Sequence, residues 1–230
     1  MNIFREPIVV HLTDSVSASS SSHEQEVIMV SLVIDSLVAR VPEGATILNA
    51  AQQLGIYIPT LCYHEDLRPY AGCRFCVVEI TQNGRSRYMS SCDTPVEEGM
   101  AVRTNTERIK RGRKMLAELL LARCPEQKPA LDMAARLGVK QTRFSSKGSD
   151  CILCGLCVRL CEEVAGAGAL GLFGRAPNKR VGTPFDRTPK ECIGCGGCTY
   201  ICSTGAMHLQ ERALEEFRKL SGPMRRCRYQ

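Results

Sequence analysis

The cysteines form the clearest chemical pattern in this sequence. Two segments share the spacing C-x2-C-x2-C-x3-C, and their eight cysteines are Cys151, Cys154, Cys157, Cys161, Cys192, Cys195, Cys198 and Cys202. This is the spacing of thiolate ligands to a pair of four-iron clusters, in which the fourth cysteine of each run ligates the other cluster. The rule predicts one [4Fe–4S] cluster on Cys151, Cys154, Cys157 and Cys202, and another on Cys192, Cys195, Cys198 and Cys161.

A third group of four cysteines lies earlier in the chain. Its spacing is C-x10-C-x2-C-x15-C, through Cys62, Cys73, Cys76 and Cys92. Plant-type two-iron ferredoxins have a shorter first gap, but they share the remaining arrangement. A loop with three thiolates follows a predicted helix, and the fourth cysteine comes from a distant strand. Gly72 stands beside Cys73, where close approach of the backbone is expected. We therefore predict a [2Fe–2S] cluster here.

The alternatives to these clusters are zinc sites and disulfides. Zinc sites use C-x2-C pairs with the second pair farther along the chain, which does not fit two four-cysteine runs. A zinc knuckle would suit the third group better, although the surrounding strands and helix favour a cluster. The residues between the cysteines also suit iron and sulfide. Glycines, at 155, 194, 196 and 197, allow the backbone to direct N–H groups at sulfur, and a dry shell is expected from Ile152, Leu153, Leu156, Val158, Ile193 and Ile201.

Composition and charge narrow the function classes. The formal net charge is +6, which by itself would allow nucleic-acid binding. Three oxidised clusters would contribute about −2 each, so the loaded protein would be near neutral and we do not expect a nucleic-acid partner. No stretch approaches the roughly 20 apolar residues of a membrane span, and the N-terminus has no signal-peptide pattern. We expect a cytoplasmic protein in which clustered cysteines bind metal.

The strands and the helix predicted around the two-iron site indicate an α+β unit over residues 28–105. Strands are expected at 29–34 and 37–41, with a turn at 35–36, followed by a helix over 45–54. Three further short strands are expected at 77–80, 88–91 and 100–103. Two strands, a helix and then more strands are compatible with a β-grasp fold.

Four other segments complete the predicted organisation. The serine-rich residues 1–27 read as a flexible arm. A helical linker is expected over 106–147, with Ile109, Leu116, Leu119 and Leu120 on its apolar face. Its basic first half, which includes Arg113, is expected to be a solvated face, with a docking face for an acidic partner as the alternative. Residues 148–208 contain the repeated cysteine runs and form a bacterial-type 2×[4Fe–4S] domain. Residues 209–230 are predicted to be a short helix and a basic tail.

The chain resembles a known family over residues 29–208. IYIPTLCYHEDLRPYAGCRFCVVEI is similar to the [2Fe–2S] domain at the head of the large iron–sulfur subunit of respiratory complex I. The same module occurs in NAD-linked formate dehydrogenases and multi-cluster [FeFe] hydrogenases. CILCGLCVRLC and CIGCGGCTYIC resemble the dicluster segment of these families. The resemblance implies partner subunits: a flavin- and NAD-binding chain on one side, and a hydrogenase, formate dehydrogenase or other reductase chain on the other.

Two departures from the family pattern matter. The family usually has an intermediate four-iron site with one His and three Cys, but only Cys124 lies between Cys92 and Cys151, and no His does. One thiolate cannot hold a four-iron cluster, so we expect this site to be absent. The family's larger members continue into a catalytic domain, whereas this sequence ends at Gln230. We expect the catalytic part to lie on another chain.

These observations predict a relay subunit that moves electrons between a two-iron and two four-iron clusters and has no catalytic site of its own. Two alternatives remain open, a stand-alone ferredoxin that shuttles between enzymes and a cluster-based redox sensor. Outside the three groups, Cys124 and Cys227 are expected to be inert thiols, although the arginines around Cys227 could lower its pKa. His64 is expected to be a surface residue, with a tuning contact to the two-iron cluster as the alternative.

Overall fold

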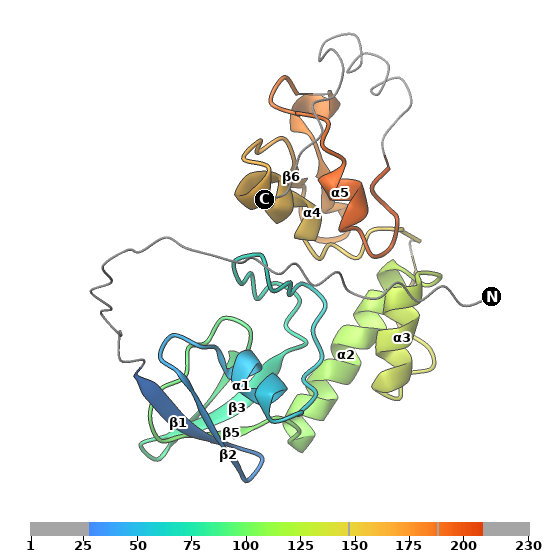
Figure 1. The fold of residues 1–230 in the computed structure, drawn as a ribbon. Helices are drawn as coiled ribbons and strands as arrows, with labels where there is room; N and C mark the ends of the chain where they lie inside the picture. Colours follow the sequence, from blue (N-terminus) through green and yellow to red (C-terminus); the bar gives the residue numbers. More distant parts are fainter. Residues whose placement is uncertain (1–27, 147, 188, 209–230) are drawn as a thin grey trace, which may run out of the picture.

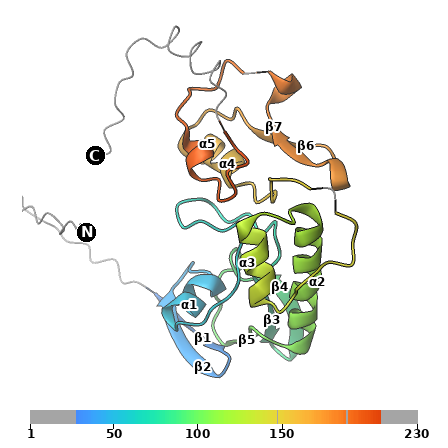
Figure 2. The same ribbon diagram turned by 90° about the vertical axis from the view of Figure 1, so that its right-hand side faces the viewer.

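The computed structural model describes residues 28–146, 148–187 and 189–208 (Figure 1). The predicted arm at 1–27, the C-terminal helix and tail at 209–230, and Cys227 lie outside these residues. Two bodies are visible, a sheet with its helices and a smaller body with the repeated cysteine runs (Figures 1 and 2). A long loop between the first helix and the third strand reaches from the first body to the second (Figure 2).

The first body is built on a five-stranded mixed sheet. Its strands, in sheet order, are β2 (Leu37–Pro42), β1 (Met29–Ile34), β5 (Met100–Arg103), β3 (Val77–Gln82) and β4 (Arg85–Ser90). β1 and β5 run parallel and the other neighbours antiparallel. Helix α1 (Ile47–Gln53) is the helix between the second and third strands. The predicted α+β class is confirmed. β1 and β5 have the predicted bounds, whereas β4 begins at Arg85 rather than Tyr88 because it pairs with all of β3.

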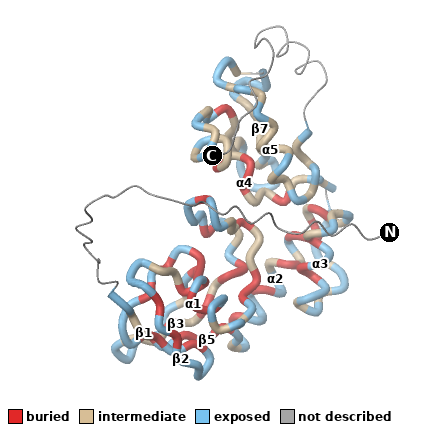
Figure 3. Tube along the Cα trace, viewed as in Figure 1, coloured by how far each residue is buried: buried red, intermediate tan, exposed pale blue. Residues whose placement is uncertain are grey.

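The core of this body lies between the sheet and α1, where the buried residues of Figure 3 converge. Alternating side chains of β1 and β3 point inward, and Ala50 and Ala51 of α1 are fully buried. Thr46 caps α1 by accepting a hydrogen bond from the Asn49 N–H at 3.2 Å. Cys76 and Cys92 belong to the same core. The packing that stabilises the sheet therefore also fixes two of the predicted iron ligands.

The predicted helical linker is two helices rather than one. α2 spans Glu107–Arg123 and α3 spans Lys128–Arg136. The break follows from Pro125, which disfavours helical backbone at the preceding Cys124, where φ is −131° and ψ is 70°. A second core joins the two helices to both cysteine-rich parts of the chain: Phe75, Ala117, Leu120, Leu121, Cys124, Ala130, Met133, Ala134 and Ile152. Leu119, which we placed on the apolar face, is 48% exposed.

Arg113 is the main correction to the predicted solvated face of α2. Only 6% of this residue is exposed. Its guanidinium donates hydrogen bonds to the carbonyls of Phe75, Thr104 and Val77, at 2.9, 3.0 and 3.0 Å. The fork of N–H groups on arginine can satisfy several carbonyls at once. α2 is therefore fastened to the strand that follows the two-iron loop by a charged side chain, which a hydrophobic pattern cannot predict.

The second body contains short elements around the cysteine runs. α4 (Leu156–Arg159) continues into a π-helix, η1 (Leu160–Val164), and α5 (Gly197–Tyr200) follows the second run. A small antiparallel hairpin, β6 (Gly171–Phe173) with β7 (Arg180–Gly182), lies between them. Two 3-10 turns, η2 (Ala176–Asn178) and η3 (Pro184–Asp186), complete this body. The sequence did not predict the hairpin or the π-helix. No helix in the described part of the chain is long and apolar enough to cross a membrane.

We predict that Arg113→Met destabilises the cluster-loaded protein by about 2–4 kcal/mol, because three buried carbonyls lose their donor. Arg111→Met is the matched control, since Arg111 is exposed on the same helix and its loss should change stability by less than about 0.5 kcal/mol. Anaerobic urea unfolding followed by circular dichroism measures both. Equal midpoints for the two variants would contradict the role given to Arg113.

Candidate metal centres

The four cysteines of the predicted two-iron site come together around the loop between α1 and β3. Cys62, Cys76 and Cys92 are each at most 2% exposed. The sulfurs of Cys76 and Cys92 are 3.4 Å apart, and the Cys73 N–H lies 3.4 Å from the Cys62 sulfur. Negative charge on Cys62 and Cys76 acts on the other members of the group. The four thiols thus form one electrostatically coupled group.

Hydrogen bonds between the thiols lower two of the four pKa values in this group and raise the other two. The hydrogen bond from the Cys73 thiol is the main reason that the pKa of Cys62 falls to about 6, and Cys92 has the same effect on Cys76, whose pKa is also about 6. In return, the pKa values of Cys73 and Cys92 are raised. Two of the four thiols are therefore largely thiolates at neutral pH, which is the form that binds metal.

Backbone geometry explains the glycine next to Cys73. Ala71 and Arg74 have φ of 52° and 62°, so the chain turns sharply on both sides of the cysteine. A side chain at Gly72 would place its Cβ 2.2 Å from the Tyr70 ring. The close approach predicted for Gly72 is thus to an aromatic ring that covers the loop.

The surroundings of the two-iron group fit an anionic sulfur-containing centre. The hydroxyls of Ser90 and Ser91, just before Cys92, are buried and have no nitrogen or oxygen partner among the described residues, and the Ser91 side chain helps to lower the pKa of the Cys76 thiol. A buried donor without an acceptor costs free energy, and thiolate or sulfide sulfur can accept such a bond. Dry thiols with N–H and O–H donors around them are the setting in which proteins hold iron–sulfur clusters.

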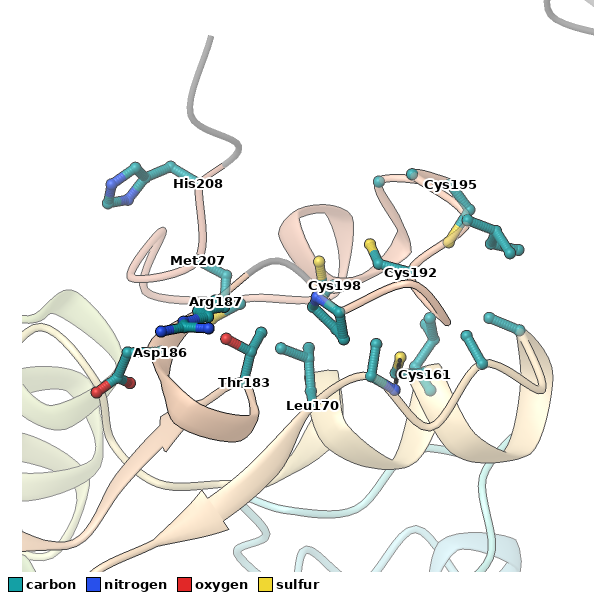
Figure 4. Close-up of a pocket in the computed structure, with 18 residues that line it drawn as sticks. Cys161, Leu170, Thr183, Asp186, Arg187, Cys192, Cys195, Cys198, Met207 and His208 are labelled. Carbon is teal, nitrogen blue, oxygen red and sulfur yellow. Dashed lines mark hydrogen bonds between the residues drawn. The ribbon is translucent and has the colours of Figure 1, made fainter. Parts of the chain in front are cut away.

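The second predicted four-iron group lines one cavity of about 300 Å³. Cys161 approaches from η1, whereas Cys192 and Cys195 approach from the opposite loop and Cys198 from α5 (Figure 4). The Ala169 N–H lies 3.3 Å from the Cys161 sulfur. Cys161 thus lies with the cysteines of the other run, as the crossed ligand rule requires. One side is less dry than predicted, because Cys195 is exposed and Ile193 is 57% exposed.

The first predicted four-iron group is more enclosed. Burial raises the pKa of Cys154, and it raises the pKa of Cys157 to about 12; charge on Cys151 and Cys202 adds to both shifts. At Cys202, burial opposes ionisation, but the Thr204 hydroxyl and the backbone N–H groups of Met207, Thr204 and Ala206 outweigh it and lower the pKa. Cys202 therefore lies within electrostatic reach of the first run although it follows the second.

Left-handed backbone lets both runs curl around a central space. Gly155 and Gly196 precede α4 and α5 with φ of 74° and 73°. At the equivalent earlier positions, Leu153 has φ of 55° and Gly194 has φ of 63°. The repeat in the sequence is thus a repeat in backbone conformation, although one copy adopts the left-handed region without a glycine, at a small cost in strain.

The structure also describes the surroundings of Cys124 and His64, two further residues that the sequence analysis singled out. Cys124 is fully buried beside Phe75 and Ile152, and burial raises its pKa to about 11. The thiol is buried, as predicted, and its raised pKa agrees with the expectation of low reactivity. The Nδ1 atom of His64 accepts a hydrogen bond from the Asp66 N–H at 3.3 Å, which is a local turn contact. Within the described residues, no three His, Cys, Asp or Glu side chains have the arrangement of a single-ion site.

Sequence reasoning missed two arginines that bind the backbone of predicted ligands. Arg123, at the end of α2, donates hydrogen bonds to the carbonyls of Cys151 and Lys179, both at 2.8 Å. Arg159 donates one to the Cys62 carbonyl. The only available signal was the position of Arg159 between two predicted ligands, Cys157 and Cys161.

Comparisons with known proteins match both halves of the site. Residues 28–107 match a 2Fe-2S iron-sulfur cluster binding domain, and residues 150–206 match a 4Fe-4S dicluster domain. The predicted cofactors, one [2Fe–2S] and two [4Fe–4S] clusters, are thereby confirmed. Which thiols bind them remains a prediction.

Relatives of known function cover much of the chain. An NADH-quinone oxidoreductase subunit of Rhizobium meliloti is 37% identical over 206 residues, which are 78% of this chain and 24% of the relative. The HndD subunit of the NADP-reducing hydrogenase of Solidesulfovibrio fructosivorans is 33% identical, over 85% of this chain and 38% of its own length. The chain thus spans only about a quarter to two fifths of these relatives.

A solved structure supports the same relationship. The crystal structure of an NAD+-reducing [NiFe]-hydrogenase in the H2-reduced state has a chain that is 30% identical, with a TM-score of 0.59, over 67% of this chain and 74% of that one. The chain therefore belongs to the family of iron–sulfur subunits in which a [2Fe–2S] domain precedes a [4Fe–4S] dicluster domain, a family with members in NADH-quinone oxidoreductase and in the NADP-reducing hydrogenase.

Proposed function

We propose that this chain is the electron-relay subunit of a larger oxidoreductase. The observation that carries the proposal is the presence of three sets of four cysteines in one chain, with the two-iron loop hydrogen-bonded to the four-iron segment. The Arg68 N–H donates to the Glu163 carboxylate at 2.8 Å across this junction. Bound clusters supply one-electron chemistry. The protein supplies separation, insulation and hydrogen bonds.

The ligand assignment is part of this proposal. The two-iron cluster is held by Cys62, Cys73, Cys76 and Cys92. The four-iron clusters are held by Cys151, Cys154, Cys157 and Cys202, and by Cys192, Cys195, Cys198 and Cys161. The same proposal divides the chain into a [2Fe–2S] domain at 28–105, a helical linker at 106–147 without a cluster, and a dicluster domain at 148–208.

Partner subunits are proposed from the relatives. We propose a flavin- and NAD(H)-binding subunit at one end of the relay and a catalytic or ferredoxin-linked subunit at the other, with the complex in the cytoplasm. The exposed side of the second four-iron site, at Cys195 and Ile193, supports electron exchange with one of these partners. A stand-alone ferredoxin shuttle is the competing function, and no observation specifically favours it.

Iron and sulfide analysis of the anaerobically purified protein tests the cofactors. We expect about ten irons per chain, two for the two-iron site and four for each of the others. About fourteen irons would reveal a further four-iron site and contradict the linker assignment. Zinc without sulfide would contradict the redox function.

Cysteine variants test the crossed ligand sets. We expect Cys202→Ser to remove the same EPR signal as Cys154→Ser, and Cys161→Ser to remove the same signal as Cys195→Ser, each with a loss of about four irons. Cys73→Ser should remove only the two-iron signal. Cys124→Ala is the control and should keep every signal. If Cys202→Ser instead matches Cys195→Ser, each run binds its own cluster and the crossed assignment is wrong.

Native gel filtration separates the relay from the shuttle. We expect the protein in an anaerobic extract to elute with larger flavoprotein or metalloenzyme chains, because a relay must hold fixed distances to its partners. Elution of all the protein at the size of the isolated chain, in low and moderate salt, would favour the shuttle.

A further inference from the structure

The short segment from Cys157 to Cys161 adjoins all three predicted centres. Cys157 belongs to the first four-iron group and lies in α4, whereas Cys161 lies in η1 and lines the cavity of the second. Arg159 lies between them at the end of α4, and its side chain extends toward the two-iron loop. A π-helix adds a residue to the helical turn, and such local changes are frequent at functional sites.

Arg159 makes a two-point contact with the two-iron loop. One terminal nitrogen, Nη2, donates to the Cys62 carbonyl and the other, Nη1, to the Arg68 carbonyl, both at 2.5 Å. The guanidinium carbon lies 5.5 Å from the centre of the Tyr70 ring, which is within the range of a cation–π contact. The planar fork therefore fixes the loop at two positions six residues apart in sequence.

The burial of Arg159 requires an explanation. The residue is 8% exposed, no carboxylate pairs with it within the described ranges, and its Nε has no hydrogen-bond partner there. Burying a charged group costs free energy unless opposite charge or hydrogen bonds compensate it. Its two hydrogen bonds end on carbonyls of the two-iron loop, and one of these belongs to the predicted ligand Cys62. Structural packing alone would be served by an apolar side chain.

Other contacts at the junction converge on the same loop. Glu163, three residues beyond Leu160 in η1, accepts the Arg68 N–H at 2.8 Å. The Tyr70 ring lies so close to Gly155 that a Cβ there would be 3.5 Å away. These contacts hold the loop from the dicluster side, and among them Arg159 is the one that binds the carbonyl of a predicted two-iron ligand, Cys62.

We propose that Arg159 is the positioning residue that fixes the separation between the two-iron centre and the four-iron centres, a role that rests on the proposed relay function. By holding the Cys62 carbonyl from a helix that also carries Cys157, it makes the two domains one rigid unit at the point where an electron crosses. The positive charge at this point also offsets the charge of the two clusters.

The test compares Arg159→Met and Arg159→Lys with Arg68→Ala in the anaerobic, cluster-loaded protein. Met removes the charge and both hydrogen bonds, whereas Lys keeps the charge but cannot span two carbonyls. Arg68→Ala is the matched control, because it keeps both backbone groups of residue 68 and removes only an ion pair with Glu163, at 3.7 Å, from a side chain that is 78% exposed. Amide hydrogen exchange over residues 62–73 and the EPR relaxation of the reduced two-iron cluster are measured.

For Arg159→Met, we expect exchange over 62–73 to be faster by about tenfold or more for each charged hydrogen bond lost. The relaxation enhancement that the reduced four-iron clusters impose on the two-iron signal should weaken, with iron content unchanged. Arg159→Lys should show smaller changes in the same direction, and Arg68→Ala the smallest, because an exposed ion pair contributes little. If the role of Arg159 were purely structural, replacing it would lower stability without changing the relaxation enhancement of the two-iron EPR signal.

The proposal is wrong if Arg159→Lys has the same amide hydrogen exchange and the same EPR relaxation as the wild type. The Lys variant also provides the test if Arg159→Met fails to assemble its clusters. The relay function is tested separately by the iron, sulfide and EPR measurements on the unmodified protein. A wild-type protein with about ten irons and an Arg159→Lys variant identical to it would refute the positioning role while leaving the relay intact.

Discussion

Loops that wrap an inorganic centre leave main-chain carbonyls inside the protein without partners from helices or strands, and these carbonyls must be satisfied. Here arginine side chains satisfy them. Arg113 donates to the backbone on both sides of Cys76, Arg123 to the Cys151 carbonyl, and Arg159 to the Cys62 carbonyl. Each of the three binds backbone at or next to a predicted ligand. The irregular loops thereby acquire fixed positions without becoming regular structure.

The same arginines also place positive charge near the negatively charged thiolate ligands. Clustered thiolates repel one another, and a dry setting strengthens that repulsion. Arg113 and Arg159 are buried, and neither forms an ion pair with a carboxylate within the described chain. Negative charge on Cys76 acts on Arg113 in turn. Part of the excess of basic residues, +6 overall, thus lies inside the protein next to predicted ligands.

The second core explains how one chain can hold separate centres in one arrangement. Phe75, next to Cys76, and Ile152, next to Cys151, pack with the buried faces of α2 and α3 around Cys124. Apolar packing gives mechanical continuity between the two-iron and four-iron ends of the molecule. It also keeps water away from their inner faces.

The sequence by itself determined the cofactors, the α+β class and most strand positions, because thiolate spacing and alternating hydrophobicity are local patterns with local physical causes. It did not predict the burial of Arg113, the break before α3 or the β6–β7 hairpin, because a charged side chain, a pre-proline residue and a three-residue strand carry weak periodic signals. Only the tertiary structure brought Arg159 to the Cys62 carbonyl, 97 residues away in sequence. That contact depends on how two domains pack, and no short-range pattern encodes the packing of two surfaces.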